Sequence, residues 1–199
     1  KDSRMSRIVM IGGHGKVALL ASPLLVDAGH EVVSLIRNPD HSADVAATGA
    51  TPLVLSVEEA DVAELTRVFA GADAIVWSAG AGGKGGPERT DAVDRAAAIR
   101  SMEAAAAAGV TRYVMVSFLT AYGEVPDDHP LRAYAIAKIA ADRHLQTTDL
   151  AWTILGPGLL TLDEPTGAIT VARVPKGTPT SKAPTSRGNV ARVITAVLA

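Results

Sequence analysis

Short runs of branched apolar residues alternate with longer helical stretches along almost the whole chain. Six of these runs have the length and composition of buried strands: 7–11, 31–36, 51–55, 74–78, 112–117 and 151–155. Helical spacing is found at 16–28, 40–47, 57–70, 90–108, 131–147 and 186–198. Strands that alternate with helices are joined by right-handed crossovers, which arrange the strands in parallel. We therefore predict an α/β fold, a doubly wound parallel sheet of the Rossmann type, with strand order 3-2-1-4-5-6.

One domain is expected to cover residues 1–199, because a chain of this length suits one core and no linker divides it. Residues 168–172 form a candidate seventh strand, and 79–86 and 175–186 are expected to be surface loops. Met5 is a candidate natural start, which would make residues 1–4 an addition ahead of it.

Composition and charge exclude several classes of function. The net charge of −2 argues against a nucleic-acid binder, and the absence of cysteine excludes a disulfide framework and a thiolate metal site. No metal site is expected, because the histidines are scattered: His14, His30, His41, His129 and His144. No apolar run reaches the ~18 residues of a membrane span, and the N-terminus lacks the apolar segment of a signal peptide. We expect a cytoplasmic monomer or homodimer that acts on a small molecule and binds neither nucleic acid nor membrane.

A glycine-rich loop, GGHGKVA at residues 12–18, joins the first predicted strand to the first predicted helix. The first glycine allows a tight turn, the third lets backbone amides approach a pyrophosphate, and the helix N-terminus adds partial positive charge. Histidine and lysine side chains in the loop can also reach phosphate. This context predicts dinucleotide binding, with a purely structural turn as the alternative. The predicted contacts are Gly12, His14, Gly15, Lys16 and Val17.

The end of the second predicted strand bears on the choice between NAD(H) and NADP(H). It reads LIRNP at residues 35–39 and contains no carboxylate. NAD enzymes usually place an acidic residue here on the ribose hydroxyls, whereas a guanidinium can pair with a 2′-phosphate. Arg37 and Asn38 therefore predict NADP(H), with NAD(H) or a merely solvated arginine as alternatives.

Tyr134 and Lys138 are four residues apart and share one face of the predicted helix 131–147. The lysine charge favours the phenolate and is expected to lower the tyrosine pKa. Such a tyrosine can exchange a proton with a substrate oxygen during hydride transfer, and the lysine can also bind the nicotinamide ribose. The alternative is a core tyrosine beside a solvated lysine.

The chain resembles the short-chain dehydrogenase/reductase superfamily, in its extended or atypical branch near the NmrA-like and biliverdin/flavin reductase groups. The segments that carry the resemblance are GGHGKVA, IRNP, GADAIVWSAGAG, AAAAAGVTRYVMVS, YAIAK and ILGPGLLT followed by TGAI, and they cover essentially the whole chain. The resemblance implies that Tyr134 is the acid/base, Lys138 its partner and Ser117 the third member, with Thr120 nearby. Further cofactor contacts that it implies are Ser56, Val57, Ser78, Ala79, Gly80 and Pro157.

Three positions depart from the family pattern. Phe118 stands where many relatives carry a second serine, Ser56-Val57 where an acidic residue near the adenine is common, and Gly156-Pro157-Gly158 where Arg-Pro-Gly is common. The resulting prediction is an NADP(H)-dependent oxidoreductase that acts on a small carbonyl or a related acceptor. A non-catalytic dinucleotide sensor remains an alternative. A nucleotide-sugar epimerase or dehydratase is a third reading, although only 44 residues follow the sixth predicted strand.

Overall fold

A six-stranded parallel sheet forms the centre of the computed structural model, which describes residues 5–81, 85–118, 127–128, 130–171 and 184–199. The strand order is β3-β2-β1-β4-β5-β6, as predicted. The fold is therefore a doubly wound α/β fold of the Rossmann type in a single domain. Its strands are β1 (Arg7–Ile11), β2 (Glu31–Ile36), β3 (Thr51–Val54), β4 (Ala74–Trp77), β5 (Arg112–Val116) and β6 (Ala151–Leu155).

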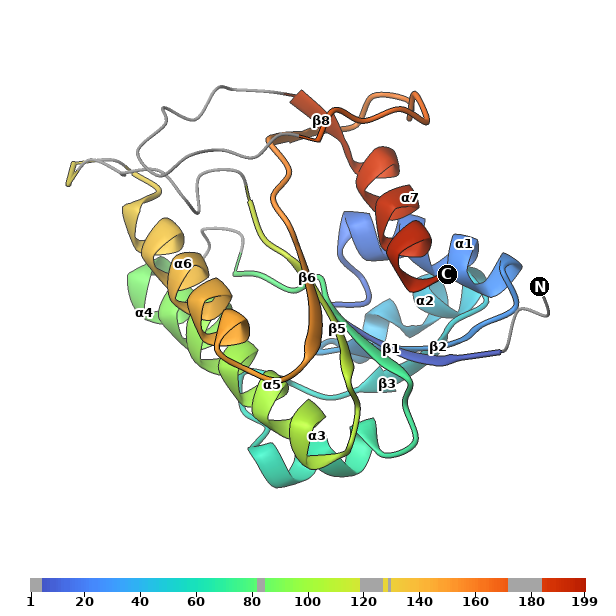
Figure 1. Ribbon diagram of the computed structural model, residues 1–199, viewed down its shortest axis with the longest axis horizontal. Helices are drawn as coiled ribbons and strands as arrows, with labels where there is room; N and C mark the ends of the chain where they lie inside the picture. Colours follow the sequence, from blue (N-terminus) through green and yellow to red (C-terminus); the bar gives the residue numbers. More distant parts are fainter. Residues whose placement is uncertain (1–4, 82–84, 119–126, 129, 172–183) are drawn as a thin grey trace.

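Helices cover both faces of the sheet (Figure 1). On one face α1 (Lys16–Asp27) packs against α7 (Arg187–Leu198), with α2 (Ser42–Ala47) near the β3 edge after the 3₁₀ turn η1 (Pro39–His41). The other face carries α3 (Val62–Phe69), α5 (Ala98–Ala107) and α6 (Arg132–Gln146). Among the described residues, none of the helices has the length and apolar character needed to cross a membrane.

Strand β1 shows why the sheet is covered on both sides. Val9 and Ile11 belong to the core beneath α3 and α5, whereas Ile8 and Met10 belong to the core beneath α1 and α7. Successive side chains of a strand point to opposite faces, so a strand that is apolar throughout must be buried on both. Each such side chain contributes roughly 1.5–3 kcal/mol when it is removed from water.

Two predicted helices have different starts in the structure. The helix predicted from residue 57 begins at Val62, because the Asp61 side chain caps it by accepting the backbone N–H of Glu64 at 2.7 Å. The helix predicted from residue 90 begins four residues earlier as α4 (Gly86–Thr90), where Pro87 suits a first helical turn. It continues through a π-helical segment, η2 (Asp91–Ala97), into α5.

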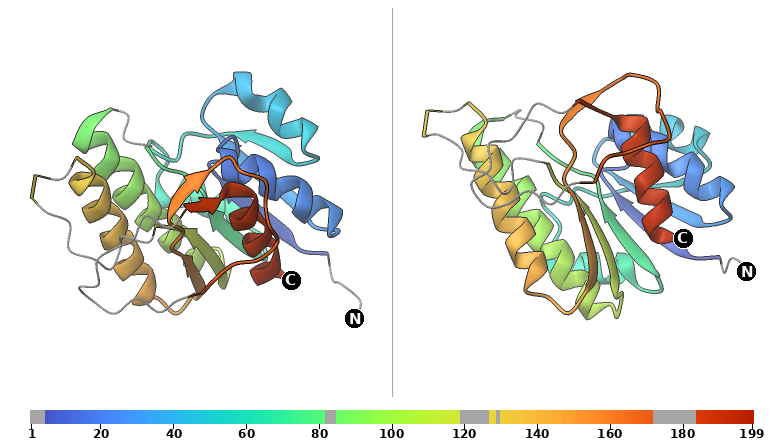
Figure 2. Two further views of the ribbon diagram at one scale, coloured as in Figure 1. Left: turned by 90° about the horizontal axis from the view of Figure 1, so that it is seen from above. Right: turned by 45° about the horizontal axis from the view of Figure 1, so that its top comes forward.

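The prediction of a seventh strand at residues 168–172 is wrong for 168–171, which have no regular structure, and residue 172 lies outside the described residues. The pattern misled because Ile169 and Val171 are exposed and have no sheet to pair with. A separate two-stranded parallel sheet forms instead between β7 (Leu159–Thr161) and β8 (Pro184–Ser186), next to the start of α7 (Figure 2). Most of the predicted loop 175–186 also lies outside the described residues.

Candidate functional site

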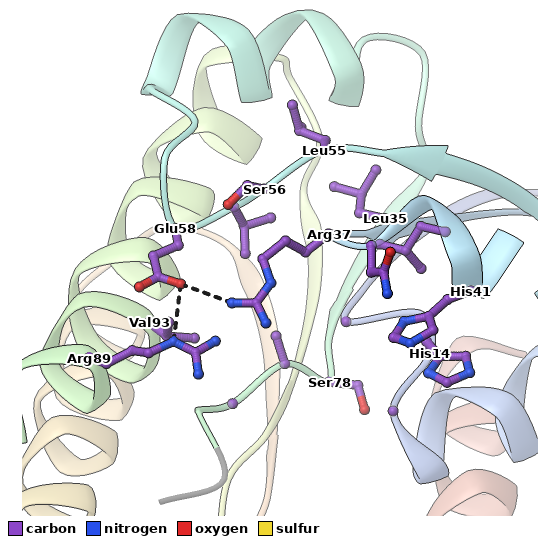
Figure 3. Close-up of a pocket in the computed structure, with 17 residues that line it drawn as sticks. His14, Leu35, Arg37, His41, Leu55, Ser56, Glu58, Ser78, Arg89 and Val93 are labelled. Carbon is purple, nitrogen blue, oxygen red and sulfur yellow. Dashed lines mark hydrogen bonds and ion pairs between the residues drawn. The ribbon is translucent and has the colours of Figure 1, made fainter. Parts of the chain in front are cut away.

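A cavity of about 300 Å³ opens where strands β1, β2, β3 and β4 end (Figure 3). Strand β1 has β2 on one side and β4 on the other, so successive strands are added in one direction before β4 and in the opposite direction from β4 onward. The cavity lies at this reversal of the strand order. This carboxyl edge is where ligands bind in open α/β sheets. Its lining residues are Gly12, His14, Gly15, Leu35, Ile36, Arg37, Asn38, His41, Leu55, Ser56, Val57, Glu58, Ser78, Ala79, Gly80, Arg89 and Val93.

The glycine loop has no room for side chains at its first two positions. A Cβ on Gly12, whose φ is +80°, would lie 2.6 Å from the Cα of Ala79. A Cβ on Gly13 would lie 2.5 Å from the Cβ of Ser34, a close approach that the sequence analysis did not assign. Gly15 is the N-cap residue of α1, and among the described residues no side chain caps this helix, so its first amides are available to an anion.

Two guanidinium groups share one carboxylate in the cavity. The Nη1 atom of Arg37 lies 3.5 Å from Oε2 of Glu58, and the Nε atom of Arg89 lies 3.3 Å from the same oxygen (Figure 3). Arg37 was predicted here from the sequence, whereas Glu58 and Arg89 were not. Glu58 follows by two residues the position where relatives often carry an acid, which is the signal that could have found it.

Two histidines that are far apart in the sequence meet beside the glycine loop. The rings of His14 and His41 stack with centroids 3.6 Å apart, and His14 Nε2 lies 2.9 Å from Oδ2 of Asp44. Their separation of 27 positions made them look unrelated, and the fold brings them together at the cavity.

A second polar cluster lies at the end of β5. Lys138 is only 2% exposed and donates from Nζ to the carbonyl of Val116 at 3.0 Å. Ser117 donates its hydroxyl to Oδ2 of Asp142 at 2.5 Å. Tyr134, one turn before Lys138, packs its ring against Phe118 with centroids 5.1 Å apart. The structure therefore gathers Tyr134, Lys138 and Ser117 around one strand end, whereas Thr120 lies outside the described residues.

Two buried carboxylates counter the lysine charge, and neither was predicted from the sequence. Asp94, on the π-helical segment η2, accepts the backbone N–H of Ala81 at 3.0 Å, and Asp142 accepts from Ser117. Burial raises the pKa of both carboxyl groups and lowers the pKa of Lys138, while the attraction between opposite charges counteracts each shift. The spacing of four residues between Lys138 and Asp142 could have revealed one of these partners.

The expectation that Lys138 lowers the pKa of Tyr134 is wrong. Burial of the phenol raises the pKa of Tyr134, and the negative charges of Asp94 and Asp142 raise it further. A neutral phenol is therefore the stable form of Tyr134 across the ordinary pH range.

Comparison with known proteins agrees with this geometry. Residues 12–199 match a family model described as NAD(P)H-binding. The chain belongs to this NAD(P)H-binding family.

Its relatives include proteins named for oxidoreductase and for epimerase activity. The uncharacterized sugar epimerase YhfK of Bacillus subtilis is 32% identical over 168 residues, which are 84% of this chain and 78% of YhfK. The solved oxidoreductase ylbE of Lactococcus lactis is 27% identical with a TM-score of 0.81, covering 96% of this chain and 84% of that one. A Bacillus halodurans protein provisionally named an NAD-dependent epimerase/dehydratase is 32% identical with a TM-score of 0.83, covering 96% and 86%. These matches agree with the resemblance to the atypical branch of the short-chain superfamily.

The residues of this NAD(P)H-binding protein fit a dinucleotide. A backbone cradle too tight for a Cβ, an uncapped helix N-terminus and a guanidinium all face one cavity. Ten predicted cofactor contacts lie on its wall: Gly12, His14, Gly15, Arg37, Asn38, Ser56, Val57, Ser78, Ala79 and Gly80. As the described residues define it, the cavity does not include four others, namely Lys16, Val17, Lys138 and Pro157. The first two begin α1, and Lys138 is buried behind the end of β5.

Proposed function

We propose that this protein is an NADP(H)-dependent oxidoreductase that reduces a small carbonyl or a related acceptor. The observation that supports it is the placement of two features on one edge of the sheet. The cavity containing Arg37 lies at the ends of β1 to β4, and the neutral phenol of Tyr134 lies near the end of the adjacent strand β5.

The division of labour follows from these positions. The cofactor, when bound, supplies the hydride. The first amides of α1 bind the pyrophosphate, Arg37 pairs with the 2′-phosphate, and Ser78, Ala79 and Gly80 form the wall beside it. These residues orient the dinucleotide and do not take part in the proton transfer.

Tyr134 supplies the proton. Its O–H bond breaks as an O–H bond forms on the substrate oxygen, and solvent later returns the proton to the phenolate. The raised pKa of Tyr134 keeps the donor protonated at rest. Lys138 acts as a positioning residue, because its bond to the Val116 carbonyl fixes α6 against the end of β5.

Cofactor preference gives the first test. Calorimetric titration of the unmodified protein should show tighter binding of NADP⁺ than of NAD⁺. Arg37→Ala should shrink the difference in binding free energy by about 1.5–3 kcal/mol, the size of a hydrogen bond to a charged group. Equal affinities for the two cofactors in the unmodified protein would refute the NADP(H) assignment.

Turnover gives the second test. NADPH oxidation, followed by its absorbance, should be accelerated by at least one member of a panel of small carbonyls, quinones and flavins. Tight NADP(H) binding with no turnover of any acceptor would favour the non-catalytic sensor instead.

A sugar epimerase is a second candidate, because YhfK and the Bacillus halodurans protein carry epimerase names. It predicts interconversion of a nucleotide sugar without net consumption of the cofactor. Proton NMR of UDP-glucose incubated with the protein and NAD⁺ would detect the epimer directly.

A further inference from the structure

We infer that Glu58 sets the cofactor preference of this protein by competing with the 2′-phosphate of NADP(H) for Arg37, and that Arg89 weakens this competition. The inference rests on the proposed NADP(H) site and adds two residues to it. Neither residue was expected from the sequence, and both line the cavity.

The three side chains come from three separate elements. Arg37 follows β2, Glu58 lies in the turn after β3, and Arg89 is on α4. Figure 3 shows Arg37 extending across the cavity toward Glu58, with His14 and His41 on the far side of Arg37 from Glu58. The 2′-hydroxyl or 2′-phosphate of a bound cofactor lies beside the residue that follows β2. When NADP(H) binds, Arg37 can therefore pair with either of two anions, the Glu58 carboxylate or the 2′-phosphate.

The ion pair between Arg37 and Glu58 is weak enough for Arg37 to exchange its partner. The Arg37 side chain is 61% exposed, and its distance of 3.5 Å to Glu58 is that of a long, partly solvated ion pair. Such pairs stabilise a protein by about 0–1 kcal/mol. A phosphate accepts shorter, charge-assisted hydrogen bonds from a guanidinium and can displace the carboxylate.

The competition applies to NADP(H) and not to NAD(H). Binding of NADP(H) separates Arg37 from Glu58 and brings a phosphate near the Glu58 charge, and both effects oppose binding. NAD(H) has no 2′-phosphate, so Arg37 can remain paired with Glu58. Glu58 therefore narrows the difference in affinity between the two cofactors.

Arg89 acts in the opposite direction. Because it shares Oε2 of Glu58 with Arg37, it neutralises part of the carboxylate charge and holds that side chain when Arg37 leaves. Without Arg89, Glu58 would pair with Arg37 alone and would repel the phosphate more strongly. Two substitutions in one ion-pair cluster should thus shift the preference in opposite directions.

Calorimetry on the full chain at low ionic strength tests this, with NADP⁺ and NAD⁺ as ligands. Glu58→Gln should tighten NADP⁺ binding about two- to fivefold, and Arg89→Gln should weaken it by a similar factor, as expected for partly exposed ion pairs. NAD⁺ affinity should change less than twofold in both variants. Glu59→Gln is the matched control: it makes the same charge change one residue away, and Glu59 does not line the cavity. It should leave both affinities unchanged.

Three results would overturn the inference alone. Equal effects of Glu58→Gln and Glu59→Gln on NADP⁺ would show a general charge effect. Weaker binding of both cofactors to Glu58→Gln would show that Glu58 contacts the part that the cofactors share. The third result is a preference for NADP⁺ that depends on Arg37 and yet is unchanged by both Glu58→Gln and Arg89→Gln. This result would show that Glu58 does not compete for Arg37, and it would leave the proposed function intact. Failure of the unmodified protein to bind either cofactor would instead overturn both proposals.

Discussion

The cavity and the cluster behind β5 both contain positive and negative side chains, but they differ in their exposure to water. In the cavity, Arg37 is 61% exposed and lies 3.5 Å from Glu58. In the cluster, Lys138 and Asp142 are each 2% exposed and Asp94 is 0% exposed. Solvated charges exchange partners at little cost, whereas a buried charge that loses its partner costs several kcal/mol. The charges in the cavity can therefore rearrange around a ligand, whereas the charges in the buried cluster keep one fixed arrangement.

The largest expected effect comes from removing the buried cation. Lys138→Met should lower the free energy of unfolding by about 3–5 kcal/mol, because it leaves Asp94 and Asp142 buried without their counter-charge. Urea denaturation at neutral pH measures the change. Arg37→Met makes a similar substitution at an exposed cation of the cavity and should cost less than about 1 kcal/mol. Similar losses of unfolding free energy in the two variants would contradict the proposed difference between the buried cluster and the exposed cavity.

Removing the phenol should affect chemistry and leave cofactor binding intact. Tyr134→Phe should lower turnover by ~10²-fold or more, the usual contribution of a positioned acid. The affinity for NADP⁺, measured by calorimetry, should stay the same because Tyr134 is not part of the cavity wall.

Tyr113→Phe is the matched control for this substitution. Tyr113 is a fully buried tyrosine in β5 whose hydroxyl bonds Ser101 and lies away from the cavity wall. Its removal should leave turnover unchanged. A reductase whose turnover survives Tyr134→Phe would contribute mainly the orientation of donor and acceptor.

The pH dependence of stability sharpens the comparison further. The folded-state pKa of Asp142 is raised above 3.8 by burial, so its stabilising contribution is present below that pH and is lost as pH rises through the folded pKa. Relative to Asp142→Asn, the unmodified protein should therefore lose stability as pH rises from 3.8, by at most about 1.4 kcal/mol per pH unit. Urea denaturation of both proteins over a pH series measures the difference.

Asp91→Asn gives a control of opposite sign. The hydrogen bond from Arg95 lowers the pKa of Asp91, which lies at the surface. Its contribution is present above 3.8 and is lost as pH falls through the folded pKa. The same pH trend in both variants would contradict the assignment of Asp142 as a carboxyl group destabilised by burial.

Most of the fold could be predicted because it is encoded locally. Apolar runs alternating with helical spacing predicted the strand order, since βαβ crossovers leave few topologies. The β7–β8 pair could not be predicted, because each strand has three residues and they join segments 25 positions apart. The strand predicted at residues 168–171 was wrong because the apolar residues of this alternating pattern are exposed and pair with no strand in the described part of the chain.

The same distinction applies to the candidate site, where features of neighbouring residues could be predicted and contacts between distant residues could not. The glycine loop, Arg37 and the Tyr134–Lys138 spacing can be read from neighbouring residues. Contacts across long separations cannot, such as Arg89 with Glu58 at 31 positions. The predicted direction of the Tyr134 pKa shift was wrong for this reason. Lys138 is visible in the helix spacing, whereas the burial of the phenol, which is the largest cause of the shift, and the nearby charge of Asp94 arise only in the folded chain.

The carboxylate of Asp94 links the two regions. One of its oxygens accepts a hydrogen bond from the amide of Ala81, the residue after the cavity wall formed by Ser78, Ala79 and Gly80, and its charge is attracted by that of Lys138. A hydrogen bond thus links the wall that would face the cofactor to a buried charge. In the proposed reductase, the position of this wall, and with it the distance from the bound cofactor to Tyr134, would depend on the buried charges behind β5.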